Sequence, residues 1–276
     1  MNKQFNNNEQ KIIKMYNLRR PMTKITKETG YSKKKIEEFL KENKLWTGHK
    51  WMPMYFDEFF FDKIDTEEKA YWLGFIYADG YLALPSTIGI ELKSSDYTHL
   101  LKFKKSLKAE HDVKIYTKKS TFGIQENCRI SFASKHMFSI LLSYFKSHKK
   151  TFYGEFPKLS DKKLIPHLIR GFFDGDGSLS GKPKDSQYIF RPSLGFIGTK
   201  ETLEYIEKIS GFKWNWSQRF PEKNTNNYTI QIGRVNDCLE FLNYMYKDAT
   251  IYLDRKYVLY KELLENREHL KAKARV

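Results

Sequence analysis

The sequence contains few cysteines and no long hydrophobic run. Cys128 and Cys238 are the only thiols among 276 residues, which is too few for a disulfide framework, and they lack the spacing of metal ligands. We therefore expect two buried thiols in a reducing compartment: the cytoplasm of a bacterium or phage host, or the interior of an organelle. No apolar run is long enough to cross a bilayer, and the N-terminus has no apolar signal core. These absences exclude a membrane-spanning segment and predict no secretion signal.

Three common catalytic motifs are also missing: a glycine-rich phosphate loop, a His-Glu-x-x-His metal motif and a Gly-x-Ser-x-Gly turn. Their absence argues against the enzyme classes that depend on them. Acidic residues are outnumbered, with 33 Asp and Glu against 49 Lys and Arg and a formal net charge of +16. This excess favours a polyanionic partner, with nucleic acid ahead of a membrane surface. Hydrophobic residues make up 40%, so we expect a globular protein with one large or two modest domains.

Two stretches, Tyr71–Gly80 and Leu168–Gly177, are apolar runs that end in an aspartate followed by a glycine. Each run has two small residues four positions apart, which are Gly74 and Ala78 in the first and Gly171 and Gly175 in the second. Residues four apart share one face of a helix, and small residues there let two helix backbones approach closely. We therefore expect two helices that pack against each other, with a left-handed stop at each final glycine.

If these helices pack along their small faces, Asp79 and Asp176 meet at the paired C-terminal ends. Both the helix dipole and the second carboxylate disfavour a negative charge there. A divalent cation between them removes the conflict, and a metal site of this kind suits phosphodiester hydrolysis. Two other interpretations exist: the small residues serve core packing alone, or residues 174–178 begin a calcium loop. An EF-hand would need glycine at its sixth position, where the chain has Leu179.

At Trp72–Gly80 and Ile169–Gly177 the chain resembles the LAGLIDADG homing endonucleases. The first copy has Tyr77 where the family usually has its first acidic residue, a departure that concerns helix capping and packing. The resemblance implies that Asp79 and Asp176 are the catalytic metal ligands. It also implies that the residues directly before them, Ala78 and Gly175, assist in holding the metal through their backbone carbonyl groups. The cofactor would be Mg²⁺, with Mn²⁺ as a substitute and Ca²⁺ binding without supporting cleavage.

After each motif the same succession of elements is predicted: a strand pair, a helix, a second strand pair and a helix. Residues of the two copies align at a constant offset of 100, as in Ile130 and Ile230, which indicates an internal duplication. The fold class is α+β. The resemblance implies tandem αββαββα repeats that form a pseudo-twofold homing endonuclease fold with antiparallel DNA-binding sheets, plus a small all-α N-terminal domain. The expected divisions are residues 1–50, a helix-turn-helix-like extension; 51–64, a linker; 65–150, the first half; and 151–276, the second half.

Strand parity predicts one polar, mainly basic face on each sheet. The predicted DNA-binding residues of these faces are Lys93, Lys114, Tyr116, Lys118, Arg129, Arg191, Lys213, Asn215, Ser217, Arg219 and Gln231. A solvated antiparallel sheet alternates in the same way. However, these are the side chains that reach phosphates and base edges, which favours DNA contact.

The N-terminal fifty residues predict short helices and a tight turn, similar to a helix-turn-helix. Ser32 is the expected N-cap of the second helix, and Lys33, Lys34 and Lys35 follow at the start of that helix. We predict that these lysines contact DNA. The alternative is a basic helical hairpin that only caps the main body.

Basic residues follow the fourth strand of each half, in the region where the family carries one near the scissile phosphates. Lys135 and Arg234 are the candidates for stabilising developing charge, and Lys93 and Lys200 are competing candidates. The combined prediction is a monomeric, metal-dependent double-strand DNA endonuclease with a long non-palindromic target and a role in intron mobility. Two alternatives are an RNA-splicing maturase that binds its own intron RNA, and a catalytically silent DNA-binding regulator on the same scaffold.

Overall fold

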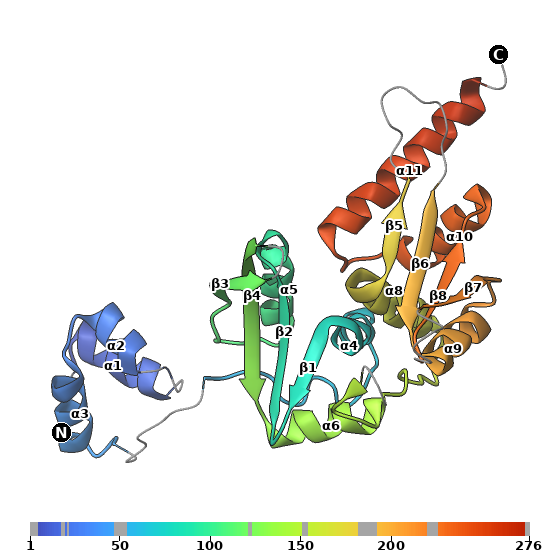
Figure 1. The fold of residues 1–276 in the computed structure, drawn as a ribbon. Coiled ribbons are helices and arrows are strands. Elements are labelled where there is room, and N and C mark those ends of the chain that lie inside the picture. Colours follow the sequence, from blue (N-terminus) through green and yellow to red (C-terminus); the bar gives the residue numbers. More distant parts are fainter. Residues whose placement is uncertain are drawn as a thin grey trace. The chain divides into compact units, whose positions relative to one another are not determined.

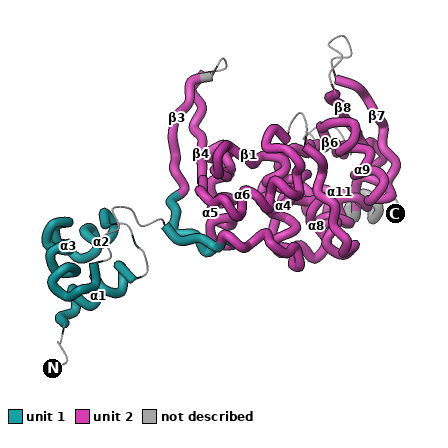
Figure 2. Tube along the Cα trace, turned by 90° about the horizontal axis from the view of Figure 1, so that it is seen from below, with its two compact units in different colours: residues 1–57, 107–112 teal, residues 58–106, 113–276 magenta. Residues whose placement is uncertain are grey.

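The structure is a computed structural model that describes most of the chain. The described residues are 5–17, 20, 22–46, 54–120, 123–150, 154–181, 192–219 and 226–273, with the backbone alone for 120 and 268–273. The chain divides into two compact units (Figure 2), one of residues 1–57 and 107–112 and one of residues 58–106 and 113–276. No helix in the described ranges is both long and apolar enough to span a membrane.

Among its described residues, the smaller unit has three helices with a common core. They are α1 (Asn7–Asn17), α2 (Met22–Thr29) and α3 (Lys33–Glu42). The core consists of buried apolar side chains from all three helices, which are Ile12, Met15, Tyr16, Ile25, Ile36 and Leu40. Gly30 takes the left-handed φ of 72° in the turn between α2 and α3. The Ser32 hydroxyl then accepts a hydrogen bond from the Lys35 amide at 3.3 Å, so the predicted N-cap is confirmed.

The first half of the larger unit follows the predicted order of elements (Figure 1). Its elements are α4 (Glu67–Asp79), β1 (Gly80–Ala83), β2 (Thr87–Lys93), the 3₁₀ turn η1 (Ser94–Asp96), α5 (Tyr97–Ser106), β3 (Lys114–Ser120), β4 (Gly123–Ala133) and α6 (Lys135–Phe145). The strands form one antiparallel sheet, sheet A, in the order β1-β2-β4-β3. Strand β4 begins at Gly123 and pairs with β3 along the whole hairpin.

The second half repeats this order. Its elements are η2 (Lys162–Leu164), α8 (Ile165–Asp176), β5 (Ser178–Ser180), β6 (Ser193–Gly198), α9 (Lys200–Ser210), β7 (Asn215–Gln218), β8 (Tyr228–Ile232) and α10 (Val235–Tyr246), followed by α11 (Asp254–Lys273). The strands form sheet B in the order β5-β6-β8-β7. The α+β class and the tandem αββαββα order are therefore confirmed.

Each sheet buries one face and leaves the other polar. In sheet A the buried side chains alternate along the central strands and include Ile88, Ile90, Cys128, Ile130 and Phe132. In sheet B the corresponding side chains are Leu194, Phe196, Ile230 and Ile232. Apolar burial on the helix side stabilises each half, so the polar faces remain available for a partner.

The motif helices α4 and α8 pack backbone against backbone. A Cβ atom on Gly74 would lie 2.0 Å from the carbonyl oxygen of Leu168, and one on Gly171 would lie 1.9 Å from that of Tyr71. Real Cβ atoms essentially never approach other atoms closer than 3.0 Å, so glycine is required at both positions. The predicted close contact between the two helices is confirmed.

Gly80 and Gly177 end these helices, but the predicted left-handed stop is wrong. Both have a φ of −75°, with ψ of 161° and 153°, which is extended backbone. Glycine is needed there for space, because a Cβ on Gly80 would lie 2.6 Å from the Ile76 side chain and one on Gly177 would lie 2.2 Å from the Phe173 ring. The chain turns straight from each helix into the first strand of its half.

Candidate active site and nucleic-acid interface

The last residue of each motif helix is an aspartate, Asp79 on α4 and Asp176 on α8. The helix ends lie together, since a Cβ on Gly175 would be 2.4 Å from the Ala78 Cβ and 3.3 Å from Oδ2 of Asp79. Burial and then the charge of Asp176 raise the pKa of the Asp79 carboxyl to about 6. The Asp176 side chain reaches solvent, yet desolvation by the surrounding protein raises its pKa as well. The structure thus brings together the two aspartates that the sequence predicts as a pair.

A buried lysine binds the C-terminal end of each motif helix. Nζ of Lys150 donates hydrogen bonds to the Ala78 carbonyl oxygen at 2.7 Å and to that of the preceding residue at 2.6 Å. Lys256 donates in the same way to the carbonyl oxygens of Phe173 and Gly177. Burial lowers the pKa of both ammonium groups to about 8, against the opposing attraction of nearby carboxylates.

Lys150 and Lys256 are not among the site residues predicted from the sequence. Both follow the last helix of their half of the duplication, α6 or α10, and that shared placement is the signal that could have identified them. Each ammonium group compensates the negative end of a helix dipole. Both also lower the pKa of the Asp79 and Asp176 carboxyls, in opposition to burial. The two aspartates therefore lie near two buried ammonium groups, those of Lys150 and Lys256.

The paired carboxylates fit a hard divalent cation. Mg²⁺ prefers one or two carboxylates and keeps several waters or phosphate oxygens, and Asp79 and Asp176 supply two such ligands. Within the described ranges no cluster of three or more His, Cys, Asp or Glu side chains exists that could form a denser cage. The Ala78 carbonyl, which the resemblance implies as a ligand, already accepts the hydrogen bond from Lys150. Its second lone pair is the one left for a metal.

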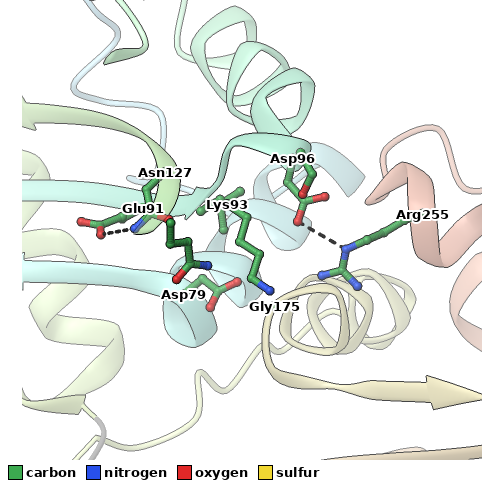
Figure 3. A pocket seen from close by; sticks show the side chains of 10 residues that line it. Asp79, Glu91, Lys93, Asp96, Asn127, Gly175 and Arg255 are labelled. Atoms are coloured by element: carbon green, nitrogen blue, oxygen red, sulfur yellow. Dashed lines mark hydrogen bonds and ion pairs between the residues drawn. The ribbon is translucent and has the colours of Figure 1, made fainter. Parts of the chain in front are cut away.

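A cavity of about 610 Å³ lies beside Asp79 and Gly175 (Figure 3). Sheet A and the segment after β2 supply most of its other lining residues, which are Glu91, Leu92, Lys93, Ser95, Asp96, Gln125 and Asn127; Arg255 comes from α11. At its edge, Nε of Arg255 lies 3.3 Å from Oδ2 of Asp96, an ion pair that joins the two halves. The cavity can therefore accept a ligand that reaches Asp79 from the polar face of sheet A.

The polar face of sheet A is charged, as predicted. The strand register places Lys114, Arg129 and Glu91 in one row, and Tyr116, Asn127 and Lys93 in the next. Lys118 pairs with Gln125 in the third row. The structure thus brings together all five predicted DNA-binding residues of this half. Three further residues complete these rows and were not predicted from the sequence: Glu91, Gln125 and Asn127.

The polar face of sheet B is uncharged in its paired strands. Asn215 pairs with Gln231, and Ser217 pairs with Thr229. Lys213 precedes β7 instead of lying within it, so its predicted place on this strand is wrong. Arg219 follows β7, and its amide donates to the Asn227 carbonyl oxygen at 2.9 Å. Arg191 lies outside the described residues.

Lys135 and Arg234 are not brought to the aspartates. Lys135 is the first residue of α6 and Arg234 directly precedes α10, and both are exposed. The basic residues that lower the pKa of Asp79 are Lys150, Lys256 and Arg255. In the described structure, therefore, the cations beside the carboxylates come from the segments after α6 and α10.

The lysines at the start of α3 are exposed in the smaller unit. Lys33 and Lys34 each lie within 4 Å of a glutamate one helical turn later, at 3.8 and 3.9 Å. The Lys35 ammonium lies 4.3 Å from the centre of the Tyr31 ring. Surface pairs of this kind are weak, so the three ammonium groups remain available to a stronger anionic partner.

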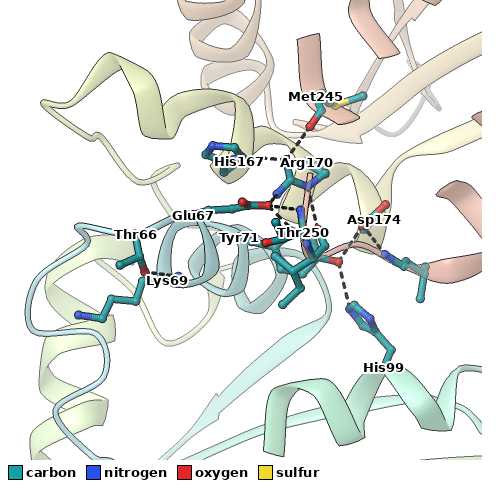
Figure 4. Close-up of polar contacts among 12 residues, drawn as sticks. Thr66, Glu67, Lys69, Tyr71, His99, His167, Arg170, Asp174, Met245 and Thr250 are labelled. Carbon is teal, nitrogen blue, oxygen red and sulfur yellow. Dashed lines mark hydrogen bonds and ion pairs between the residues drawn. The ribbon is translucent and has the colours of Figure 1, made fainter. Parts of the chain in front are cut away.

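A buried polar network joins the two motif helices (Figure 4). Arg170 is fully buried, and its guanidinium donates to Glu67 Oε1 at 2.6 Å and to the carbonyl oxygens of Met245 and Ile251. The same glutamate oxygen accepts from the Thr250 amide at 2.8 Å. Because Glu67 is on α4 and Arg170 on α8, this ion pair ties the two halves together.

The first acidic position of each motif differs between the copies. Asp174 is buried and accepts hydrogen bonds from the Tyr71 hydroxyl and the Leu253 amide, each at 2.7 Å. Burial raises the pKa of the Asp174 carboxyl despite these donors. In the first copy the Tyr77 hydroxyl instead forms a hydrogen bond with Oγ1 of Thr202 at 2.9 Å. Asp174 therefore joins α8 to α4 through Tyr71, and Tyr77 joins α4 to α9 through Thr202, so the departure at Tyr77 concerns packing.

Comparison with known proteins found no matching protein-family profile and no matching curated sequence. Among solved structures, the LAGLIDADG homing endonuclease I-GzeII in complex with its DNA target matches with a TM-score of 0.51 and 13% identity, over 75% of this chain and 92% of that one. The meganuclease I-AabMI bound to uncleaved DNA matches at 0.47 and 16%, over 74% and 92%. Full-length DUF199/WhiA from Thermatoga maritima matches at 0.46 and 18%, over 79% and 71%. With its two αββαββα halves and backbone-packed motif helices, the chain has the LAGLIDADG homing endonuclease fold.

Proposed function

We propose that the protein is a metal-dependent, site-specific DNA endonuclease that cuts both strands of a long non-palindromic target. The observation that carries this proposal is the meeting of Asp79 and Asp176 at the ends of two helices that only glycine allows to touch. Burial raises the pKa values of both carboxyl groups and so disfavours their charged forms, which means that stability alone does not explain two aspartates at this place. Their placement beside the polar face of sheet A suits a reaction on a bound phosphodiester.

Asp79 and Asp176 would hold Mg²⁺, which, when bound, supplies Lewis-acid activation at the scissile phosphates. Lys150 and Lys256 fix the helix ends, so each aspartate keeps its position. Their ammonium groups also offset the negative charge of the carboxylates, which lowers the repulsion that an incoming phosphate meets. The glycines at the interface hold the two carboxylates close enough to act on the two strands of one duplex.

DNA would bind across the polar faces of both sheets, with α2 and α3 of the smaller unit acting as a helix-turn-helix on flanking sequence. The unequal halves make a non-palindromic target the natural match, and one chain suffices, so we propose a monomer. Cationic side chains on sheet A and on α3 would release counterions from DNA. Binding should therefore weaken steeply as salt rises.

The test uses a target selected from randomised duplex DNA and the full-length variants Asp79→Asn and Asp176→Asn. Each variant should lose Mg²⁺-dependent cleavage by about 10³-fold or more, because each removes one carboxylate of the metal site. Both should keep the affinity of the unaltered protein, since the sheets carry binding. Asp248→Asn is the matched control: this aspartate is exposed at a positive φ of 59°, which asparagine tolerates.

Undiminished cutting by either motif variant would refute the assignment. Tight, specific DNA binding with no metal-dependent cutting would instead identify a silent regulator on this scaffold. Preference for structured intron RNA over duplex DNA in filter binding would identify a maturase.

A further inference from the structure

Tyr77 connects the end of α4 to the segment that carries Lys150. Its hydroxyl donates a hydrogen bond to the Gly154 carbonyl oxygen at 3.2 Å, and the Gly154 amide donates to the Lys150 carbonyl oxygen at 2.9 Å. The Lys150 ammonium then returns to the same helix, where it binds the carbonyl oxygens of Tyr77 and Ala78. The Lys150 backbone is therefore held by the residue whose own carbonyl group the ammonium binds.

The direction of the Tyr77 hydroxyl is set from the second half. This hydroxyl gives its one proton to Gly154, so it accepts in its hydrogen bond with Thr202 at 2.9 Å. Thr202 is on α9, and its hydroxyl accepts in turn from the Thr199 hydroxyl at 3.1 Å. Tyr77, Thr202 and Thr199 are all buried, so water competes little for these groups. A donor on α9 therefore directs the Tyr77 proton toward a carbonyl group of the first half.

Asp174 has the equivalent place on α8 and connects that helix to the segment that carries Lys256. Its carboxylate accepts from the Leu253 amide at 2.7 Å, and the Leu253 carbonyl oxygen accepts from the Lys256 amide at 3.0 Å. The Lys256 ammonium then binds the carbonyl oxygens of Phe173 and Gly177, at the end of the same helix. The second half thus repeats the arrangement of the first.

The first half in turn holds the Asp174 carboxylate (Figure 4). The Tyr71 hydroxyl of α4 donates to this carboxylate at 2.7 Å, and its oxygen lies 3.0 Å from Nε2 of His99 on α5. His99 is 1% exposed, and its Nδ1 has no hydrogen-bond partner among the described residues. This is the state expected when Nε2 carries the ring proton and donates to Tyr71. A donor chain from α5 and α4 therefore ends on Asp174.

The residue type at this motif position follows from the backbone group that it holds. In the first half that group is a carbonyl oxygen, which needs a donor, and Tyr77 supplies a hydroxyl proton. In the second half the group is an amide, which needs an acceptor, and Asp174 supplies a carboxylate oxygen. This requirement explains why a tyrosine stands at one position and an aspartate at the other.

We propose that Tyr77 and Asp174 are positioning residues: each holds the buried lysine of its own half at the motif helix end, and each depends on a hydroxyl group that the other half supplies. The inference deepens the proposed function, on which its consequence for cleavage rests. The ammonium groups of Lys150 and Lys256 offset the charge of the aspartates, so a displaced lysine should slow the reaction. Neither half then completes its own site.

The first experiment measures each lysine without DNA or metal. The full-length protein is treated with an amine-acylating reagent at one pH, and mass spectrometry gives the labelling rates of the buried Lys150 and Lys256. Tyr77→Phe keeps the ring but removes the hydroxyl. It should raise the rate at Lys150 by about fivefold and that at Lys256 by about twofold or less, as expected for the loss of one buried hydrogen bond.

Tyr71→Phe is the matched control, because it removes a buried hydroxyl from the same helix. This hydroxyl holds Asp174 and not the segment of Lys150. The variant should therefore leave the rate at Lys150 unchanged and raise that at Lys256 by about threefold. General loosening of the helix interface would instead raise both rates in both variants.

The second experiment changes Thr202, which lies in the second half but acts on the lysine of the first. Thr202→Val is similar in shape and lacks the hydroxyl that donates to Tyr77, so it should raise the labelling rate of Lys150 by about threefold. Thr202→Ser keeps the hydroxyl and should label at the rate of the unaltered protein, within about twofold.

The third measurement is cleavage of a selected target duplex with Mg²⁺. Tyr77→Phe should lower kcat by about fivefold and leave KM within about twofold, because the hydroxyl positions a group at the reaction centre and does not contact DNA. An unchanged kcat in a variant whose Lys150 has become accessible would overturn this consequence for cleavage.

A Tyr77→Phe variant with no faster labelling at Lys150, or with equal increases at both lysines, would overturn the positioning role. Equal labelling of Lys150 in Thr202→Val and Thr202→Ser would refute its dependence on the other half. A protein that cuts no target would overturn the proposed function, and the labelling rates would still decide whether Tyr77 positions Lys150.

Discussion

Replacing Gly171 with alanine tests the central contact between the motif helices. The added Cβ would lie 1.9 Å from the Tyr71 carbonyl oxygen and 2.8 Å from the Phe75 amide nitrogen. The first distance is roughly 1.5 Å short of an ordinary van der Waals contact. Both obstructing atoms belong to the backbone of α4, so no change of rotamer can relieve the clash and the helices must move apart.

The steric strain should lower the free energy of unfolding by roughly 3 kcal/mol or more, which is the upper end of the range for overpacked cores. Alanine is the better helix former by about 1 kcal/mol, which offsets part of that strain. The free energy of unfolding should therefore fall by about 2 kcal/mol or more. Separation of the helix ends also moves Asp79 away from Asp176, so metal-dependent cleavage should fall more than stability alone explains.

The measurement is urea unfolding followed by circular dichroism, with hydrogen exchange on peptides from α4 and α8 to locate the change. Gly233→Ala is the control, because a Cβ at that exposed glycine would meet no atom within 4 Å. It should leave stability unchanged or raise it by up to about 1 kcal/mol. If Gly171→Ala were as stable as this control, the backbone contact between the motif helices could not be as close as described.

The remaining predictions concern charge and burial. Glu67→Ala leaves the buried Arg170 unpaired and should lower the free energy of unfolding by about 3 kcal/mol, the lower end for a buried ion pair, because Glu67 is 21% exposed; a urea titration measures it. Folding raises the pKa of Asp79 from 3.8 to about 6, so the metal-free folded state binds the extra proton in that range. Its stability should fall as pH rises between those values, and Asp79→Asn should flatten the fall in a plot of Tm against pH. Burial raises the pKa of the Cys238 thiol to about 11, so a disulfide reagent should label neither Cys238 nor Cys128 at neutral pH until the protein unfolds.

The duplication and the fold class were readable from the sequence because both depend on local patterns. Apolar runs, caps and strand alternation repeat at a constant offset, and each half forms its elements in the predicted order. The two motif aspartates were identified for the same reason, since each ends a run with small residues four apart. Gly80 and Gly177 show the limit of local rules: both end helices, but they are glycine because Ile76 and Phe173 leave no room for a Cβ.

The cations beside the aspartates were not predictable in this way. Lys150 lies 71 residues beyond Asp79 and Lys256 lies 80 beyond Asp176, and only their shared placement after the last helix of each half relates them. Lys135 and Arg234 looked better placed because they follow the fourth strands at equivalent positions. Which basic residue meets the carboxylates depends on how the segment after each last helix returns across the interface.

By itself the sequence determined the elements, their repetition and the residues that face outward, because helix and strand periodicities act over a few residues. The tertiary structure alone decided which residues meet. Strand register placed Glu91 opposite Asp79 but Ile197 opposite Asp176, and backbone contact between α4 and α8 set the distance between the carboxylates. Contacts between distant segments depend on the packing of the whole chain, so no local pattern records them.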